Sequence, residues 1–190
     1  MVKKLLNFFF TNLASQLYTP EESIKKHGGK VGRHVFWGKD VLVDFDYAFL
    51  LEIGDGAVIS ARTIIELHDS CIPNVMGRGL NKIGRVCIGR RSYIGVSSVI
   101  LPGVSIGDGA IVGAMSLVNR DIPGEEVWAG IPVKFICTVQ ELDKKRKSES
   151  GDRTAYFDWI GEIEKSALEY PAYKKNFIER VRAHFDHAVS

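Results

Sequence analysis

The sequence predicts an all-β solenoid, a parallel β-helix built from six-residue repeats with helical segments at both ends. Three observations predict it: an aliphatic residue recurs at every sixth position from Ile88 to Val118, glycine follows it in most repeats, and the fifth position is small or β-branched. An α-helix would space apolar residues 3.6 apart, and a half-buried strand would alternate with period two. A period of six instead indicates short flat strands in stacked coils, each burying its apolar residues against the next.

The repeats fall into two blocks that are out of phase. The regular block has its first positions at Ile88, Ile94, Ile100, Ile106, Val112 and Val118. An earlier block places Ile53, Ile59 and Ile65 in the same role, but Ile53 and Ile88 are 35 residues apart, which is not a multiple of six. The slip falls in residues 69–82, which have a proline, two glycines and no periodicity, so we expect a loop extruded from the solenoid. Loops on rigid scaffolds often carry function.

A chain of 190 residues accommodates one domain with appendages. We expect a helical or extended N-terminal segment at 1–40, the β-helix at 41–138, and a linker with α-helices at 139–190. Apolar residues at positions 5, 6, 9, 13 and 17 share one helical face. That helix is expected to pack on its own domain or a neighbouring subunit; peripheral membrane contact through residues 1–17 and a secretory signal are the alternatives.

The C-terminal part is predicted to begin with a highly charged surface turn or linker over 139–150. Two amphipathic helices follow, at about 154–169 and 172–187, separated by Pro171. Their apolar faces are expected to pack against the core or a subunit.

Composition excludes several classes of function. The net charge is +2, which gives no reason to expect nucleic acid as a partner. Three cysteines without CxxC spacing indicate neither a zinc site nor a disulfide framework, so a cytoplasmic location is expected. No stretch of sequence is long and apolar enough to span a bilayer.

The stretch ILPGVSIGDGAIVGAMSLVNRDIPGEEVWAGIPVKFI at 100–136 resembles the closing coils of the hexapeptide sugar O-acetyltransferases, the galactoside and maltose acetyltransferase group with relatives that decorate bacterial polysaccharides. DFDYAFLLEIG at 44–54 and LHD at 67–69 are also similar, so the resemblance covers roughly 41–138. It implies a left-handed β-helix, acetyl-CoA as acyl donor, a hydroxyl acceptor, and a homotrimer with its sites at subunit boundaries. Three positions depart from the family pattern: Tyr93 replaces a tryptophan, Met115 a glycine, and Asn119-Arg120 a Thr-Lys pair.

His68 is the candidate general base. Acyl transfer from a thioester to a hydroxyl needs a group that accepts the hydroxyl proton, and imidazole has a suitable intrinsic pKa. His68 is the only histidine between Ile53 and Pro132, and the resemblance implies a catalytic base at this corner. A purely structural histidine is the alternative. Asp69, Glu66 or a backbone carbonyl is expected to fix the imidazole tautomer, and Asp69 alternatively caps the loop.

The remaining site residues follow from the resemblance. It points to the backbone N–H of Val96 as oxyanion donor. It places pantetheine along Gly95, Ala114 and Asn119, with Tyr93 beside them. Arg120 is expected either to pair with a cofactor phosphate or to be a solvated surface residue. Asp46 and Tyr47 match the family's acceptor-binding Asp-Tyr, and Arg78 in the extruded loop is available for an acidic sugar or a nucleotide phosphate.

The sequence therefore predicts an acetyl-CoA-dependent O-acetyltransferase acting on a sugar or glycan hydroxyl. An N-acetyltransferase acting on an amino sugar, free or nucleotide-linked, and a non-catalytic solenoid scaffold stay open. The γ-type carbonic anhydrases share the solenoid but need three histidines around zinc. Only His68 lies within the repeats, so no metal is expected.

Overall fold

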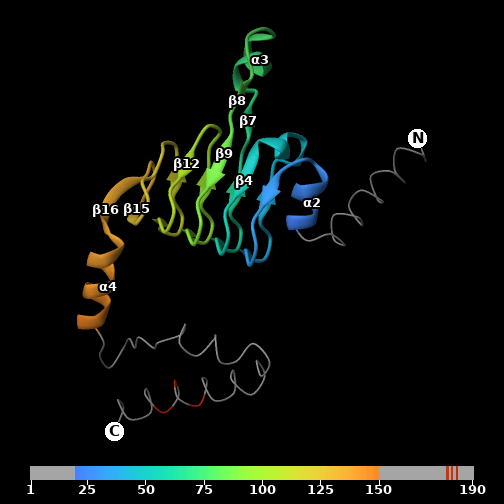
Figure 1. Cartoon of the computed structure of the whole chain (residues 1–190). Coiled ribbons are helices and arrows are strands. Elements are labelled where there is room, and N and C mark those ends of the chain that lie inside the picture. Colours follow the sequence, from blue (N-terminus) through green and yellow to red (C-terminus); the bar gives the residue numbers. More distant parts are fainter. Residues whose placement is uncertain (1–19, 150–178, 180, 182, 184–190) are drawn as a thin grey trace. The chain divides into compact units, whose positions relative to one another are not determined.

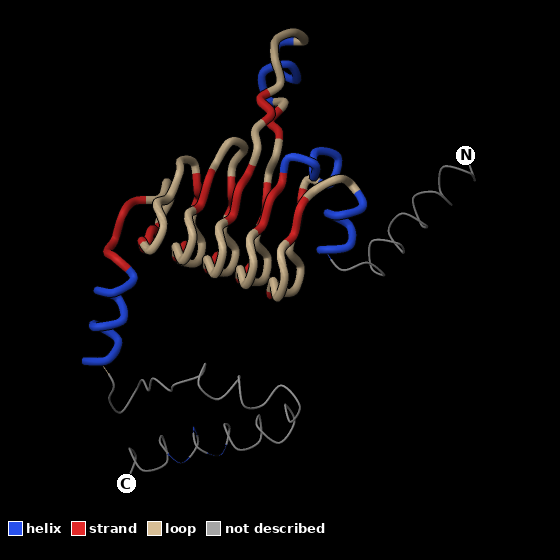
Figure 2. The backbone as a smooth tube through the Cα atoms, in the orientation of Figure 1, coloured by secondary structure: helices blue, strands red, loops and turns tan. Residues whose placement is uncertain are grey.

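The computed structural model describes residues 20–149 together with residues 179, 181 and 183. Over residues 20–138 the chain forms a solenoid whose short strands stack coil on coil (Figures 1 and 2). The chain passes through three sheets in turn. Two of them are entirely parallel, and the third is parallel except for its last strand, which pairs antiparallel. The predicted parallel β-solenoid is thereby confirmed.

Each sheet collects one strand from every coil. Sheet A contains β1 (Lys30–Val31), β4 (Leu51–Ile53), β9 (Val86–Ile88) and β12 (Ser105–Ile106). Sheet B contains β2 (Phe36–Trp37), β5 (Val58–Ile59), β10 (Tyr93–Ile94), β13 (Ile111–Val112), β15 (Glu126–Ala129) and the antiparallel β16 (Lys134–Thr138). Sheet C contains β3 (Leu42–Val43), β6 (Ile64–Ile65), β11 (Val99–Ile100) and β14 (Leu117–Val118). The corners where the chain turns are named below A–B, B–C and C–A after the sheets they join.

The register between strands of successive coils explains why the two blocks of repeats are out of phase. Ile88 pairs with Ile106, 18 residues later, so one regular coil is three six-residue repeats. Ile53 pairs with Ile88, 35 residues later, because the chain leaves the solenoid between them. The excursion is a hairpin of β7 (His68–Asp69) and β8 (Lys82–Ile83), antiparallel to each other, with α3 (Cys71–Met76) between them. The predicted extruded loop is present, and Figure 1 shows it projecting from the stack.

The core is a column of inward-facing aliphatic side chains supplied by the first positions of the repeats. Ile59, Ile65, Ile94, Ile100, Val112 and Val118 have no exposed surface. Each such side chain contributes about 1.5–3 kcal/mol by leaving water. Hydroxyls at fifth positions are also buried, and each satisfies its hydrogen-bonding needs locally: Ser92 donates to the Gly89 carbonyl at 2.8 Å, and Ser116 to the Gly113 carbonyl at 2.7 Å.

The solenoid begins earlier than the sequence predicted. We expected the boundary at residue 41, but β1 at Lys30–Val31 already pairs with β4, and β2 pairs with β5. The first coil is followed by η1 (Phe45–Leu50), and α2 (Pro20–Lys26) precedes it, burying Ile24 completely. Since Val31 and Trp37 each precede a glycine, this coil follows the six-residue pattern with a tryptophan in place of an aliphatic residue.

The C-terminal region differs from the expected linker, because Val139–Ser148 forms the helix α4. Ion pairs between side chains four residues apart accompany it: Lys147 with Asp143 at 2.6 Å and Lys145 with Glu149 at 3.7 Å. The helices predicted at 1–17 and 154–169 lie outside the described residues, as does most of that at 172–187. Among the residues that the structure describes, no helix has the length and apolar character needed to cross a membrane.

Candidate functional site

His68 lies at the C–A corner, where the chain passes from β6 into the extruded hairpin. Its Nδ1 is hydrogen-bonded to the carboxylate of Asp44, which follows β3 one coil earlier. The backbone N–H of Asp44 donates to the Ile65 carbonyl at 3.1 Å, so the stacking of the two coils brings the two side chains together. The Tyr47 ring, carried by η1, stacks on the imidazole with centroids 4.6 Å apart and planes inclined by 28°.

Asp44 controls the protonation of the imidazole. The hydrogen bond from His68 raises the pKa of the imidazole above its ordinary value, and the negative charge of Asp44 acts in the same direction. The charges of Glu66 and Asp46 add to the increase in pKa, while partial burial opposes it. A carboxylate that accepts from Nδ1–H leaves Nε2 as the unprotonated nitrogen of the neutral ring. The Asp44 side chain is 10% exposed and that of His68 34%, so the imidazole remains accessible while its partner is largely buried.

The residue that orients His68 is therefore not among those expected from the sequence. Asp69 instead accepts the Cys71 N–H at 2.8 Å in the turn that leads into α3, and this bond lowers the pKa of its carboxyl. The reason is strand geometry: His68 and Asp69 are neighbours in β7, so their side chains point to opposite faces. The alternative reading of Asp69 as a loop cap matches the structure.

The expected acceptor residues divide into two groups. Tyr47 contacts the His68 ring, and the charge of Asp46 acts on it. Arg78 lies in the extruded hairpin between α3 and β8 and is exposed. Within the described part of the chain it makes no hydrogen bond or ion pair, and nothing places it near the imidazole.

The B–C corner carries the residues expected at the donor groove. Consecutive coils approach closely here: a Cβ on Gly95 would lie 2.4 Å from the Ala114 nitrogen, so glycine is required. The Met115 N–H donates to the Val96 carbonyl at 2.8 Å, which aligns the coils. The N–H groups of Val96 and Ala114 themselves have no hydrogen-bond partner among residues 20–149.

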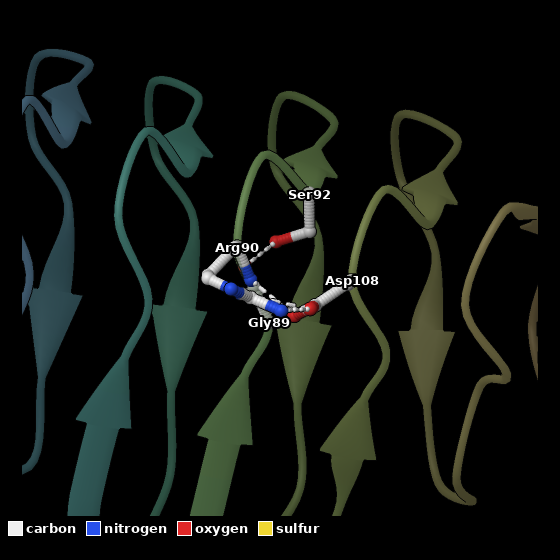
Figure 3. A network of polar contacts seen from close by, with 4 residues as sticks. All are labelled: Gly89, Arg90, Ser92 and Asp108. Carbon is white, nitrogen blue, oxygen red and sulfur yellow. Dashed lines mark hydrogen bonds and ion pairs between the residues drawn. The ribbon is translucent and has the colours of Figure 1, made fainter.

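The A–B corner shows why these amides are unpaired. There the Arg90 N–H donates to Asp108 Oδ1 of the next coil at 2.7 Å, and the arginine side chain binds Oδ2 through Nε at 2.9 Å and Nη2 at 2.7 Å (Figure 3). The equivalent next-coil residue above Val96 is Ala114, which has no side-chain acceptor. The amide of Val96 is thus without a partner within residues 20–149, which is compatible with the oxyanion donor expected from the sequence.

The two groups of site residues lie at different corners of the same chain. Tyr93, 43% exposed on the outer face of sheet B, leads into Gly95 and Val96 at the B–C corner. His68 lies at the C–A corner, as do Asn119 and Arg120, which follow β14 and are exposed. Strand β11 of sheet C (Val99–Ile100) lies between the two corners. One chain alone does not bring the imidazole to the Val96 amide.

Comparison with known proteins agrees with this architecture. The family described as bacterial transferase hexapeptide (six repeats) matches residues 88–120. YvoF of Bacillus subtilis, named as a candidate acetyltransferase, is 33% identical over 121 residues, covering 64% of this chain and 67% of that protein. The galactoside O-acetyltransferase of Escherichia coli is 32% identical over 119 residues, covering 60% of this chain and 56% of that enzyme.

Two solved structures share the fold. One is the hexapeptide-repeat acetyltransferase VCA0836 of Vibrio cholerae complexed with acetyl-coenzyme A, with a TM-score of 0.51, 24% identity, and coverage of 58% of this chain and 60% of that one. The other is a galactoside acetyltransferase in complex with coenzyme A, with a TM-score of 0.52, 24% identity, and coverage of 75% and 79%.

Proposed function

The chain belongs to the bacterial hexapeptide-repeat transferases, and from this premise we propose that it transfers an acetyl group from acetyl-CoA to a hydroxyl of a sugar or glycan. The observation that carries the proposal is the His68 imidazole, held by Asp44 and stacked on Tyr47 at a corner of the solenoid. The relatives named above, one a galactoside O-acetyltransferase and two solved with acetyl-CoA or CoA, support the donor and the acceptor class.

His68 is the general base in this proposal. Its Nε2 accepts the acceptor's hydroxyl proton while the hydroxyl oxygen forms a bond to the thioester carbonyl carbon. The tetrahedral intermediate then collapses, the carbon–sulfur bond breaks, and His68 returns the proton to the leaving thiolate of CoA. Asp44 fixes the tautomer and stabilises the imidazolium that forms between the two steps.

The B–C corner holds the donor. The unpaired N–H of Val96 stabilises the oxyanion, and the unpaired N–H of Ala114 on the next coil binds the pantetheine chain. Gly95 lets the ligand approach the backbone, and Tyr93 flanks it. Asn119 and Arg120 are exposed at the C–A corner. There Asn119 adds a contact to the pantetheine chain, and Arg120 forms an ion pair with a cofactor phosphate.

Because the base and the oxyanion donor occupy different corners, we propose that a complete site joins the C–A corner of one chain to the B–C corner of its neighbour. Three copies in a closed ring form three such sites.

The outward residues of the sheets support this arrangement. Sheets B and C present apolar columns, Phe36, Val58, Tyr93 and Ile111 on one and Leu42, Ile64, Val99 and Leu117 on the other. Sheet A presents Lys30, Glu52, Cys87 and Ser105.

Calorimetric titration of acetyl-CoA into the purified protein tests the donor without knowledge of the acceptor. We expect binding with one molecule per chain. Release of free CoA thiol in the presence of sugars and glycans then identifies the acceptor, with His68→Ala as the control that binds acetyl-CoA but does not turn over. Absence of acetyl-CoA binding refutes the proposed function and leaves the scaffold interpretation; turnover with amines alone leaves the N-acetyltransferase.

A further inference from the structure

The B–C corner continues beyond the donor residues toward the N-terminal coils. Main-chain hydrogen bonds link its successive coils: Arg62 N–H to the Lys39 carbonyl at 2.9 Å, and Ser97 N–H to the Ala61 carbonyl at 3.0 Å. Lys39 and Ala61 therefore lie in the same column as Val96, two coils and one coil before it. Coils stack about 4.8 Å apart, so Arg62 is anchored about 5 Å from the coil of the proposed oxyanion donor.

The chemical character of this corner changes at Val96. On one side Ala114 and Met115 are apolar, and Met115 is 68% exposed, which suits a pantetheine chain. On the other side the exposed side chains are the cations Lys39 and Arg62 together with one carboxylate, Asp40. If the donor extends from Val96 past Ala114, the two cations line the opposite side, where the acceptor binds.

These cations are not neutralised as the arginines of the A–B corner are. Arg33 and Arg90 each form a two-nitrogen ion pair with an aspartate of the next coil, as Figure 3 shows for Arg90. Within residues 20–149, the side chains of Lys39 and Arg62 make no hydrogen bond and no ion pair. Asp40 occupies the position one coil before Arg62 and is exposed, but it forms no ion pair with it.

A backbone donor lies in the same two coils, since Ala61 directly precedes Arg62 and follows Lys39 by one coil in its column. The N–H of Ala61 has no hydrogen-bond partner in the described part of the chain. Gly38 of the preceding coil keeps this amide uncovered, because a Cβ there would lie 2.2 Å from the Ala61 nitrogen. An unpaired amide on the same corner as an ammonium and a guanidinium supplies a suitable set of donors for an anion.

We propose that Lys39, Arg62 and the Ala61 amide form an anion subsite for the acceptor, which therefore carries a carboxylate or phosphate group beside its sugar ring. This inference rests on the proposed function, since the position of the oxyanion donor defines the acceptor side. The charges around the base agree with it: Asp44, Asp46 and Glu66 all act on His68. They repel an anionic group from the C–A corner and direct it to the cations of the B–C corner.

The test compares glucose, glucuronate and glucose 1-phosphate by NMR titration at low ionic strength, with and without saturating CoA. The wild-type protein is expected to bind at least one anionic sugar about tenfold or more tightly than glucose, an advantage that salt reduces. The double variant Lys39→Gln/Arg62→Gln should lose this advantage and bind CoA as before.

Arg91→Gln is the matched control. Arg91 is an exposed arginine with the same left-handed backbone conformation as Arg62, φ 53° against 59°, but at the A–B corner. This variant should keep the wild-type preference. Equal binding of neutral and anionic sugars, or a preference that persists in the double variant, overturns the proposal. Absence of CoA binding is read separately and refutes the acetyltransferase proposal instead.

Discussion

Replacing Asp44 by Asn tests the proposed catalytic arrangement most directly. The substitution preserves the size of a side chain that is 10% exposed, but it removes the charge and the carboxylate acceptor that hold Nδ1 of His68. General base catalysis contributes about 10²–10⁴-fold, and an imidazole without its orienting carboxylate loses part of that. We expect kcat to fall by about 10–10³-fold with little change in acetyl-CoA affinity, measured by thiol release and calorimetry.

The pH profile separates an electrostatic role of Asp44 from a merely structural one. Asp44 raises the pKa of His68, and the base must be deprotonated, so the acidic limb of kcat/KM in the wild-type enzyme lies above the ordinary imidazole value of about 6.5. In Asp44→Asn the pKa falls and the limb moves to lower pH. Asp69→Asn, which alters the turn that leads into α3, should leave the limb in place. Wild-type kcat with an unmoved limb in Asp44→Asn would refute the reasoning.

Three further changes have definite expected outcomes. His68→Ala should lower turnover by about 10²–10⁴-fold with acetyl-CoA binding retained, as thiol release and calorimetry will show. Gly95→Ala introduces a Cβ 2.4 Å from the Ala114 nitrogen and should lower the free energy of unfolding by about 1–3 kcal/mol in denaturant titrations. Val99→Glu places a charge on the outer face of sheet C and should dissociate the proposed trimer in light scattering, whereas Cys87→Glu on sheet A should not.

Much of the solenoid could be predicted from the sequence, because the six-residue repeat of aliphatic residues reflects the stacking of the coils. The regular block from Ile88 gives the coil length, and the 35-residue offset from Ile53 locates the extruded hairpin. The first coil was missed although Val31, Trp37 and Val43 keep the six-residue spacing. Trp37 packs against the core where other coils have an aliphatic residue, so a search for aliphatic first positions passes over it.

The hydrogen-bond partner of His68 could not be predicted from the sequence in this way. Strand β3 pairs with β6 at a separation of 22 residues, because η1 lengthens that coil beyond the regular 18. Asp44 lies beside His68 only because of this irregular register, and no local sequence motif indicates that the two side chains are in contact. The resemblance pointed to the Val96 amide, but the sequence did not show that this amide and those of Ala61 and Ala114 have no acceptor within residues 20–149, because that depends on which side chain the next coil places above each.

The three corners show how one repeat produces different chemistry. Where the next coil supplies an aspartate, as Asp108 does for Arg90, the amide of the earlier coil is satisfied. Where it supplies alanine, as Ala114 does for Val96, that amide has no partner within residues 20–149. At the third corner the repeat is interrupted, and the hairpin that replaces it carries His68 to Asp44. In the proposed function both of these corners contribute, the B–C corner through the Val96 amide and the C–A corner through His68. The proposed symmetric ring of copies is the arrangement that joins the two corners in one site.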